Sequence, residues 1–237
     1  MRVLWLWAVG VLGLDQAGVI LPAQMMRHLS HHLLLYGTGE KFGSAGRSFD
    51  SRVLPQLRRS GYEALDLWLP GTLGRDVQAA LTVAAATMPL ARVELAPGLA
   101  LPPEFEACGS RSWNWDGIAF STATHSSFKG CVLRATINGH LVTLASETGR
   151  AEGTPPPEAA QLLVLPRAAG AAAAHRPARG ALLLASVSQT EWQSASWLRL
   201  RRQWAGEGVA VLATATEGSV HLRLDADGRL RRRSVGL

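Results

Sequence analysis

Short apolar runs alternate along the chain with amphipathic stretches, a pattern typical of strands and helices stacked in layers. The run Leu33-Leu-Leu-Tyr36 is apolar throughout and ends at Gly37-Thr-Gly39, which predicts a buried strand leading into a tight turn. Residues 65–69 alternate between apolar and polar positions and predict a second strand, which stops at Pro70-Gly71. We therefore expect a core built on β-sheets.

Three stretches have the apolar spacing of helices: residues 52–60, residues 75–88, and residues 190–205 behind a capping box at 190–193. The inward positions are predicted to be Val53 and Leu57, then Val77, Leu81 and Ala84, then Trp197, Leu200 and Trp204.

Strands are predicted over residues 113–122, 130–137 and 141–145, with Asn138-Gly139 as a two-residue hairpin turn between the last two. Residues 209–214 and 219–224 are predicted to close a further hairpin, followed by a basic tail. Strand meanders with helices between them predict an α/β fold in which two sheets pack together and helices flank them.

The first residues allow three interpretations. Residues 3–14 are mostly apolar behind Arg2, a length that is short for a membrane span and suits a signal core. Asp15 interrupts the run and no clean Ala-x-Ala site follows. We expect a strand within residues 1–14, with a signal or the remnant of a preceding membrane helix as alternatives, and one domain over residues 15–237.

A hydrophobic fraction of 47% and a charged fraction of 18% over 237 residues predict a packed globule. The net charge is +6, and nearly all the positive charge is arginine, because Lys41 and Lys129 are the only lysines. Arginine suits phosphate, so DNA is a candidate partner, although the base composition of the gene would also explain the bias. The candidate DNA-contacting side chains are Arg58, Arg59, Arg199, Arg201 and Arg202; solvated helix faces are the alternative, and a frayed end is the alternative for the basic tail.

One stretch carries a specific resemblance. Cys108-Gly-Ser-Arg-Ser-Trp-Asn-Trp-Asp-Gly117 is followed by Ser127-Phe-Lys-Gly-Cys-Val-Leu-Arg134, and the spacing of Trp113 and Trp115 places both rings on one face of a strand. With the order of the preceding elements, this resembles the C-terminal domain of ComEC-type DNA-uptake proteins, from about Leu14 onward.

The resemblance implies a metallo-β-lactamase-like αββα sandwich on the periplasmic face of the inner membrane, beside a membrane channel domain. In an oxidising compartment it favours a disulfide between Cys108 and Cys131, the only cysteines; in the cytosol they would be small buried residues. Intact relatives carry zinc or manganese and resemble hydrolases that cut the non-transforming DNA strand.

The metal ligands that this family needs are replaced here. Where the family has a His-x-Asp-x-Asp-His loop, this chain has Gly71, Leu73, Arg75 and Asp76. An arginine repels a divalent cation and a single carboxylate does not hold one. The other expected ligand elements fall at Gly37, at Ser146 or Glu147 after a slip of one residue, at Pro166-Arg-Ala-Ala169, and at Glu191-Trp-Gln-Ser194.

These observations predict a non-catalytic, metal-free domain of the DNA-uptake machinery that binds DNA or supports the channel domain. An alternative is a hydrolase with relocated ligands, and another is a purely structural interaction module. The relocated ligands would come from Asp66, Asp76, Glu147 and the cluster of His28, His31 and His32.

Overall fold

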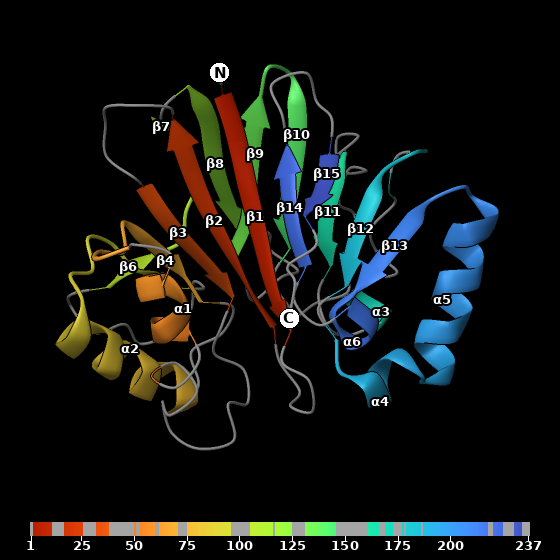
Figure 1. Ribbon diagram of the computed structural model, residues 1–237, viewed down its shortest axis with the longest axis horizontal. Helices are drawn as coiled ribbons and strands as arrows, with labels where there is room; N and C mark the ends of the chain where they lie inside the picture. Colours follow the sequence, from red (N-terminus) through yellow and green to blue (C-terminus); the bar gives the residue numbers. More distant parts are fainter. Residues whose placement is uncertain are drawn as a thin grey trace.

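Two β-sheets lie at the centre of the computed structural model, with helices at both flanks (Figure 1). The structure describes residues 2–10, 17–25, 32–37, 50, 53–59, 62–70, 75–95, 105–115, 117–124, 131–145, 161–165, 169–172, 177, 179–185, 187–217, 220–224 and 230–233.

The first sheet has six strands in the order β15-β14-β1-β2-β3-β4. Its neighbouring strands are antiparallel except for β3 and β4, which are parallel. The strands are β1 (Arg2–Gly10), β2 (Ala17–Met25), β3 (His32–Gly37), β4 (Leu67–Leu69), β14 (Val220–Leu224) and β15 (Leu230–Arg233). The apolar run near the start of the chain therefore contains a central strand, β1, which pairs with β2 and β14.

The second sheet has seven strands in the order β13-β12-β11-β10-β9-β8-β7. It is antiparallel from β7 to β10 and parallel from β10 to β13. The strands are β7 (Arg111–Trp115), β8 (Ile118–Thr124), β9 (Cys131–Ile137), β10 (His140–Ala145), β11 (Leu162–Leu165), β12 (Leu182–Ala185) and β13 (Ala210–Ala213).

Helices flank the sandwich at two sides (Figure 1). The first group is α1 (Leu54–Arg59) and α2 (Arg75–Thr87), beside a small parallel pair of strands, β5 (Glu94–Leu95) and β6 (Glu106–Ala107). The second group is α3 (Ala169–Ala172), α4 (Gln189–Trp192), α5 (Ala195–Gly206) and α6 (Thr214–Glu217). None of the helices among the described residues is both long enough and apolar enough to span a bilayer.

Strand β3 shows why a continuous apolar run was needed. Leu34 and Tyr36 belong to the core between the two sheets, whereas Leu33 and Leu35 belong to the core beneath α1 and α2. Because successive side chains of a strand point to opposite faces, a strand covered on both faces has no polar position. The same reason makes the predicted alternation of residues 65–69 wrong, since all three residues of β4 are buried.

The inward faces of the helices agree with the spacing in the sequence. Val77, Leu81 and Ala84 of α2 are at most 3% exposed. Trp197, Leu200 and Trp204 of α5 are buried in a third apolar cluster, which also contains Leu163 and Leu183 of the seven-stranded sheet. The predicted α/β architecture of two mixed sheets flanked by helices is confirmed by this topology.

The single strand predicted over residues 113–122 is wrong. The chain turns back between β7 and β8, which pair as an antiparallel hairpin. Gly117 has a φ of 81° and its N–H donates to the side chain of Asn114 at 2.8 Å. Glycine adopts that φ without strain, so Gly117 suits this turn. The predicted turn at Asn138-Gly139 is confirmed by φ values of 48° and 82°.

The hairpin predicted at the end of the chain is also wrong. Strand β13 lies at the edge of the seven-stranded sheet and β14 lies inside the six-stranded sheet, with α6 between them. The basic tail is not a frayed end over residues 230–233, because β15 pairs with β14. Both segments form strands but do not pair with each other: β13 pairs with β12, and β14 pairs with β1 and with β15.

Candidate functional site

The loop expected to hold metal follows β4. Residues 71–74 lie outside the described part of the chain, and helix α2 begins at Arg75. Gly37 is the last residue of β3 and Ala169 is the first residue of α3, whereas residues 146–147 and 166–168 lie outside the described residues. Within the described residues there is no group of three or more histidine, cysteine, aspartate or glutamate side chains that would hold a metal ion.

Two residues of the relocated-ligand hypothesis do meet. His32 Nδ1 lies 3.2 Å from Asp66 Oδ1, and Asp66 Oδ2 accepts the backbone N–H of Leu33 at 2.7 Å. His32 is the first residue of β3 and Asp66 directly precedes the parallel strand β4, whereas Asp76 follows β4 in the first turn of α2. Asp66 and Asp76 therefore flank opposite ends of one strand, while His28, His31 and Glu147 lie outside the described residues.

His32 belongs to a cluster of aromatic rings. Its ring stacks on that of Trp115, with centroids 4.7 Å apart and an interplanar angle of 11°. Trp113 lies edge-on to Trp115 at 5.6 Å and stacks on Phe120 at 5.5 Å. The prediction that Trp113 and Trp115 share one face of a strand is confirmed. We call His32, Trp113, Trp115 and Phe120 the aromatic cluster.

An ionic cluster adjoins these rings, made of Arg92, Glu94, Glu106 and Arg111. The guanidinium of Arg92 lies 5.2 Å from the Trp113 ring centroid, and its Nε lies 3.2 Å from Glu94 Oε1. This distance allows an ion pair between Arg92 and Glu94, but the geometry at Arg92 Nε does not meet the angle that a hydrogen bond needs. Arg111 lies 3.9 Å from Glu94 and donates a hydrogen bond to Glu106 at 2.5 Å.

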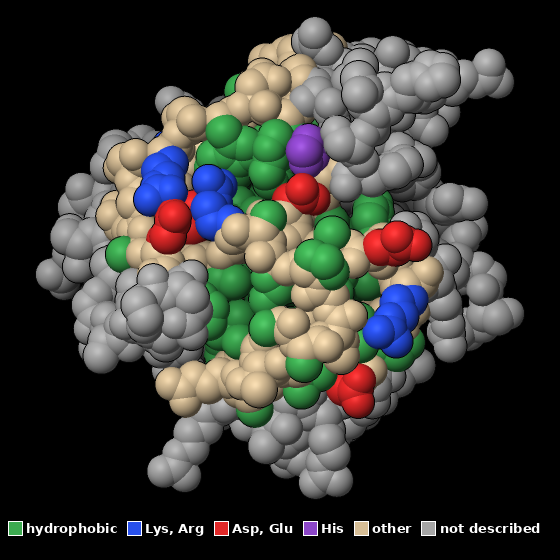
Figure 2. All heavy atoms as spheres, turned by 90° about the vertical axis from the view of Figure 1, so that its left-hand side faces the viewer, with side chains coloured by type: hydrophobic (Ala, Val, Ile, Leu, Met, Phe, Trp, Pro, Cys, Tyr) green, Lys and Arg blue, Asp and Glu red, His purple; other side chains and the backbone are tan. Residues whose placement is uncertain are grey.

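Glu94 is the unusual member of the ionic cluster, because its side chain has no exposed surface. Burial raises the pKa of Glu94 above its usual value, although Arg92 and Arg111 lower it. Among the described residues, neither carboxylate oxygen of Glu94 has a hydrogen-bond partner, and neither does Nε1 of Trp113. On the flank that carries α1 and α2, hydrophobic side chains lie at the surface beside histidine and near basic and acidic side chains (Figure 2).

The arrangement of the rings disfavours base stacking. Phe120 lies parallel to Trp113 and the Arg92 guanidinium lies over the same ring, while His32 lies parallel to Trp115. A nucleobase needs an open ring face. Both tryptophans are partly buried and pack against the core between the sheets, so the aromatic cluster closes the sandwich at this edge.

The sequence reasoning missed both the ionic cluster and the contact between His32 and Trp115. The spacing Arg92-Val-Glu94 was a usable signal, because residues two apart in a strand point to the same side. The sequence holds no comparable signal for the contact between β3 and β7, because this contact joins residues 83 positions apart.

The element at residues 191–194 is used for helix capping. Ser188, not Thr190, begins the capping box: its hydroxyl accepts the N–H of Glu191 at 3.2 Å, and the Glu191 carboxylate accepts the N–H of Ser188. Ser194 then caps α5 by accepting the N–H of Trp197. The predicted helix over residues 190–205 is therefore two helices, and Trp192 between the caps is buried.

The candidate DNA-contacting arginines do not form one surface. Arg58 is exposed on α1, and α1 and α5 lie at opposite flanks of the molecule (Figure 1). The Arg59 side chain lies outside the described residues. On α5, Arg199 and Arg202 are exposed, whereas Arg201 lies over the ring of Trp192 at 4.1 Å and is partly buried.

A disulfide joins Cys108 and Cys131, whose Cα atoms are 6.0 Å apart. The hydroxyl of Tyr36 donates to the carbonyl of Cys131 at 2.6 Å, and this buried hydrogen bond links the six-stranded sheet to the seven-stranded sheet. The cysteines thus belong to the closure of the sandwich near the aromatic cluster, in which Trp113 and Phe120 pack against the same core.

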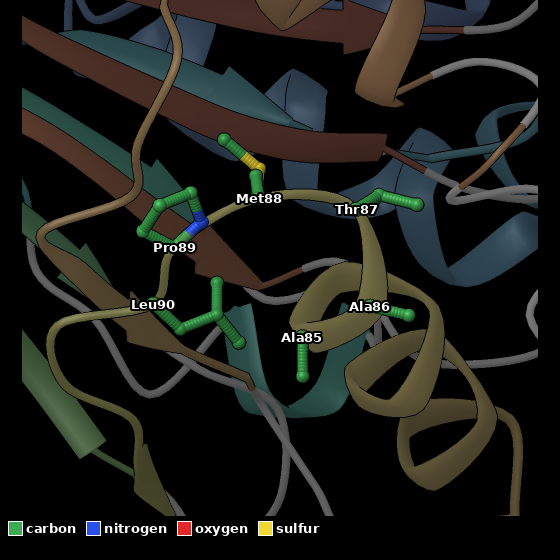
Figure 3. A pocket seen from close by; sticks show the side chains of 6 residues that line it. All are labelled: Ala85, Ala86, Thr87, Met88, Pro89 and Leu90. Atoms are coloured by element: carbon green, nitrogen blue, oxygen red, sulfur yellow. The ribbon is translucent and has the colours of Figure 1, made fainter.

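Two adjoining pockets lie at the end of α2. The larger, of about 510 Å³, is lined by Ala85, Ala86, Thr87, Met88, Pro89 and Leu90 (Figure 3). The smaller, of about 360 Å³, shares Thr87 and Met88 and adds Tyr62, whose pKa burial raises to about 12. The smaller pocket is also lined by Arg58 and Glu63, so a single carboxylate lies beside a neutral phenol there, which is not a set of metal ligands.

No protein-family model matches the chain. No curated protein matches it either. Among solved structures, a HARLDQ-motif mutant of a metallo-β-lactamase from Cronobacter sakazakii is 15% identical, with a TM-score of 0.44 over 63% of this chain and 64% of that one. The HARLDQ-motif metallo-β-lactamase of the same organism is 14% identical, with a TM-score of 0.42 over 63% of this chain and 62% of that one.

The Rm3 metallo-β-lactamase is 12% identical, with a TM-score of 0.43 over 82% of this chain and 79% of that one. The matched region spans less than two thirds of the first two structures. At TM-scores this low, the similarity supports no statement about activity.

Proposed function

We propose that this chain is a non-catalytic, metal-free domain of the ComEC type that acts in DNA uptake during natural transformation. It works on the periplasmic face of the inner membrane, where it binds DNA without reading its sequence or supports a neighbouring channel domain. The proposal combines the order of motifs in the sequence with the chemistry of the residues that stand where metal ligands are expected.

The observation that carries the proposal is the composition of the loop after β4. A hydrolase of this fold needs a dense set of imidazoles and carboxylates so that its metal deprotonates water near neutral pH. Gly71 and Leu73 offer no ligand atom, and Arg75 adds a positive charge between them and Asp76. These residues do not fit zinc or manganese, so no catalytic step follows from them.

The described structure adds independent support at residues 191–194. Where the family pattern has a histidine, this chain has Gln193, which is exposed and ends α4. The flanking Glu191 and Ser194 are committed to capping two successive helices. A polar side chain that satisfies backbone N–H groups in this way contributes to folding and is not held in reserve for a ligand.

Metal analysis of the purified chain, together with DNA binding and cleavage assays, tests the proposal. We expect less than one equivalent of zinc or manganese after dialysis, no chelator-sensitive cleavage, and DNA binding that weakens as salt rises. An intact metallo-β-lactamase carried through the same dialysis is the matched control. Stoichiometric metal with chelator-sensitive cleavage contradicts the metal-free part, and absence of DNA binding at low salt contradicts the DNA-binding part.

A further inference from the structure

The outer face of α5 has an unusual distribution of charge. Arg199 and Arg202 are one turn apart and both exposed, so they lie on the same face of the helix. The positions three and four residues away from each hold no carboxylate. Neither side chain forms an ion pair with a residue in the described part of the chain. Within the described part of the chain, no carboxylate neutralises these two charges.

The fold holds this face outward. Trp197, Leu200 and Trp204 anchor the opposite side of α5 in the core, and the Trp197 ring contacts that of Trp204 at 6.2 Å. Ser194 fixes the start of the helix by accepting a backbone N–H. A helix anchored along one side cannot rotate, so its arginines are presented in a fixed register, with less conformational entropy to lose on binding.

The residues around the two arginines leave them uncrowded. Ala205 and Gly206 are small and exposed, and a Cβ atom at Gly206 would meet nothing within 4 Å. Leu198, 38% exposed, is the only exposed large hydrophobic side chain among the described residues. A helix that lies in a membrane surface needs a continuous apolar stripe, and a protein interface needs a desolvated apolar centre. One leucine supplies neither.

We propose that the outer face of α5 binds the backbone phosphates of DNA through Arg199 and Arg202. This inference rests on the proposed function and narrows it to one face of the molecule. Guanidinium groups suit phosphate oxygens, and contacts to the backbone need no base recognition. Arg201 is not part of this contact, because its guanidinium lies over Trp192 with its Nε buried.

The test is fluorescence anisotropy with labelled single-stranded and duplex oligonucleotides of random sequence, titrated over a range of salt concentrations. Each phosphate contact contributes about 0.7 to the slope of log K against log salt for single strands and about 0.9 for duplexes. The double variant R199Q/R202Q should therefore reduce the magnitude of this negative slope by about 1.4 for single strands and by about 1.8 for duplexes. The single variant R202Q should lower it by about half of that amount.

The matched control is R58Q, which removes one exposed arginine from α1 at the opposite flank. It changes the net charge as much as R202Q does and should leave the slope unchanged. Circular dichroism establishes that all variants are folded, as their exposure predicts. Vesicles of phosphatidylglycerol, compared with phosphatidylcholine, provide the membrane arm of the test.

The outcomes separate the two proposals. If the wild-type chain binds DNA and R199Q/R202Q keeps the full slope, or R58Q loses as much as R202Q, the assignment to α5 is wrong and the proposed function stands. If the chain binds phosphatidylglycerol vesicles through these arginines and does not bind DNA, both the assignment and the DNA-binding function are wrong.

Discussion

Replacing Trp197 with alanine tests the packing that fixes the outer face of α5. Trp197 is 2% exposed, and its ring contacts Trp192 at 5.5 Å and Trp204 at 6.2 Å. Burying a tryptophan side chain removes roughly 200 Å² of accessible surface from water. At about 25 cal/mol per Å², this burial contributes at most about 5 kcal/mol to the free energy of unfolding. Since the surroundings relax partly into the cavity, we expect Trp197→Ala to lower the free energy of unfolding by about 3–5 kcal/mol.

The neighbouring residue is the control, because Leu198 has the same helical context and is 38% exposed. Leu198→Ala should change the free energy of unfolding by no more than about 0.5 kcal/mol. Urea denaturation followed by far-UV circular dichroism measures both values. If Trp197→Ala does not fold, Trp197→Phe keeps an aromatic ring and should show a smaller loss. A loss below about 1 kcal/mol for Trp197→Ala, equal to that of Leu198→Ala, would refute the anchoring of α5 through this face.

Three further predictions concern the closure of the sandwich. Burial raises the pKa of Glu94, so the free energy of unfolding should fall as the pH rises from 4.5 through the raised pKa. Glu94→Gln should flatten this pH dependence in urea denaturation, and parallel pH profiles of the variant and the wild type would contradict it. Replacing Cys108 and Cys131 with alanine opens a loop with a sequence separation of 23 and should cost about 3 kcal/mol, with an unchanged denaturation midpoint as the opposing result. Tyr36→Phe removes the donor to the Cys131 carbonyl and should cost about 1–3 kcal/mol, and thermal melts matching wild type would count against that hydrogen bond.

Elements with strong local periodicity could be predicted from the sequence. The inward residues of α2 and α5 follow helical spacing, and the burial of β3 follows from a run with no polar position. In these elements the chain itself determines which face is apolar, whatever packs on it. The Asn138-Gly139 turn is equally local, because its positive φ values depend on two residues.

Elements whose partners are distant could not be predicted in the same way. Strands β13 and β14 have the composition of a hairpin, but the short helix α6 sends them to different sheets. The short helix α3 consists of alanine and glycine only, so it has no amphipathic pattern that would predict it. Sheet membership depends on long-range pairing, about which local spacing holds little information.

In the candidate site, too, local features could be predicted from the sequence and long-range contacts could not. The shared face of Trp113 and Trp115 is a property of one strand, so it was predictable. The ionic cluster joins β5, β6 and β7, and Glu94 becomes a buried charge only because these segments meet. The two arginines of α5 were visible in the sequence, but their separation from Arg58 needed the three-dimensional arrangement.

Several described residues of the motifs that resemble ComEC-type domains have structural roles in this sandwich. Trp115 joins β7 to β3 through its contact with His32, and the hydroxyl of Tyr36 joins the two sheets at Cys131. Cys108 is linked covalently to the same point. None of these contacts needs a metal ion. A chain can therefore keep all of them when the loop after β4 contains glycine, leucine and arginine. A resemblance built on such residues therefore reports the architecture, and the chemistry has to be argued from the loops themselves.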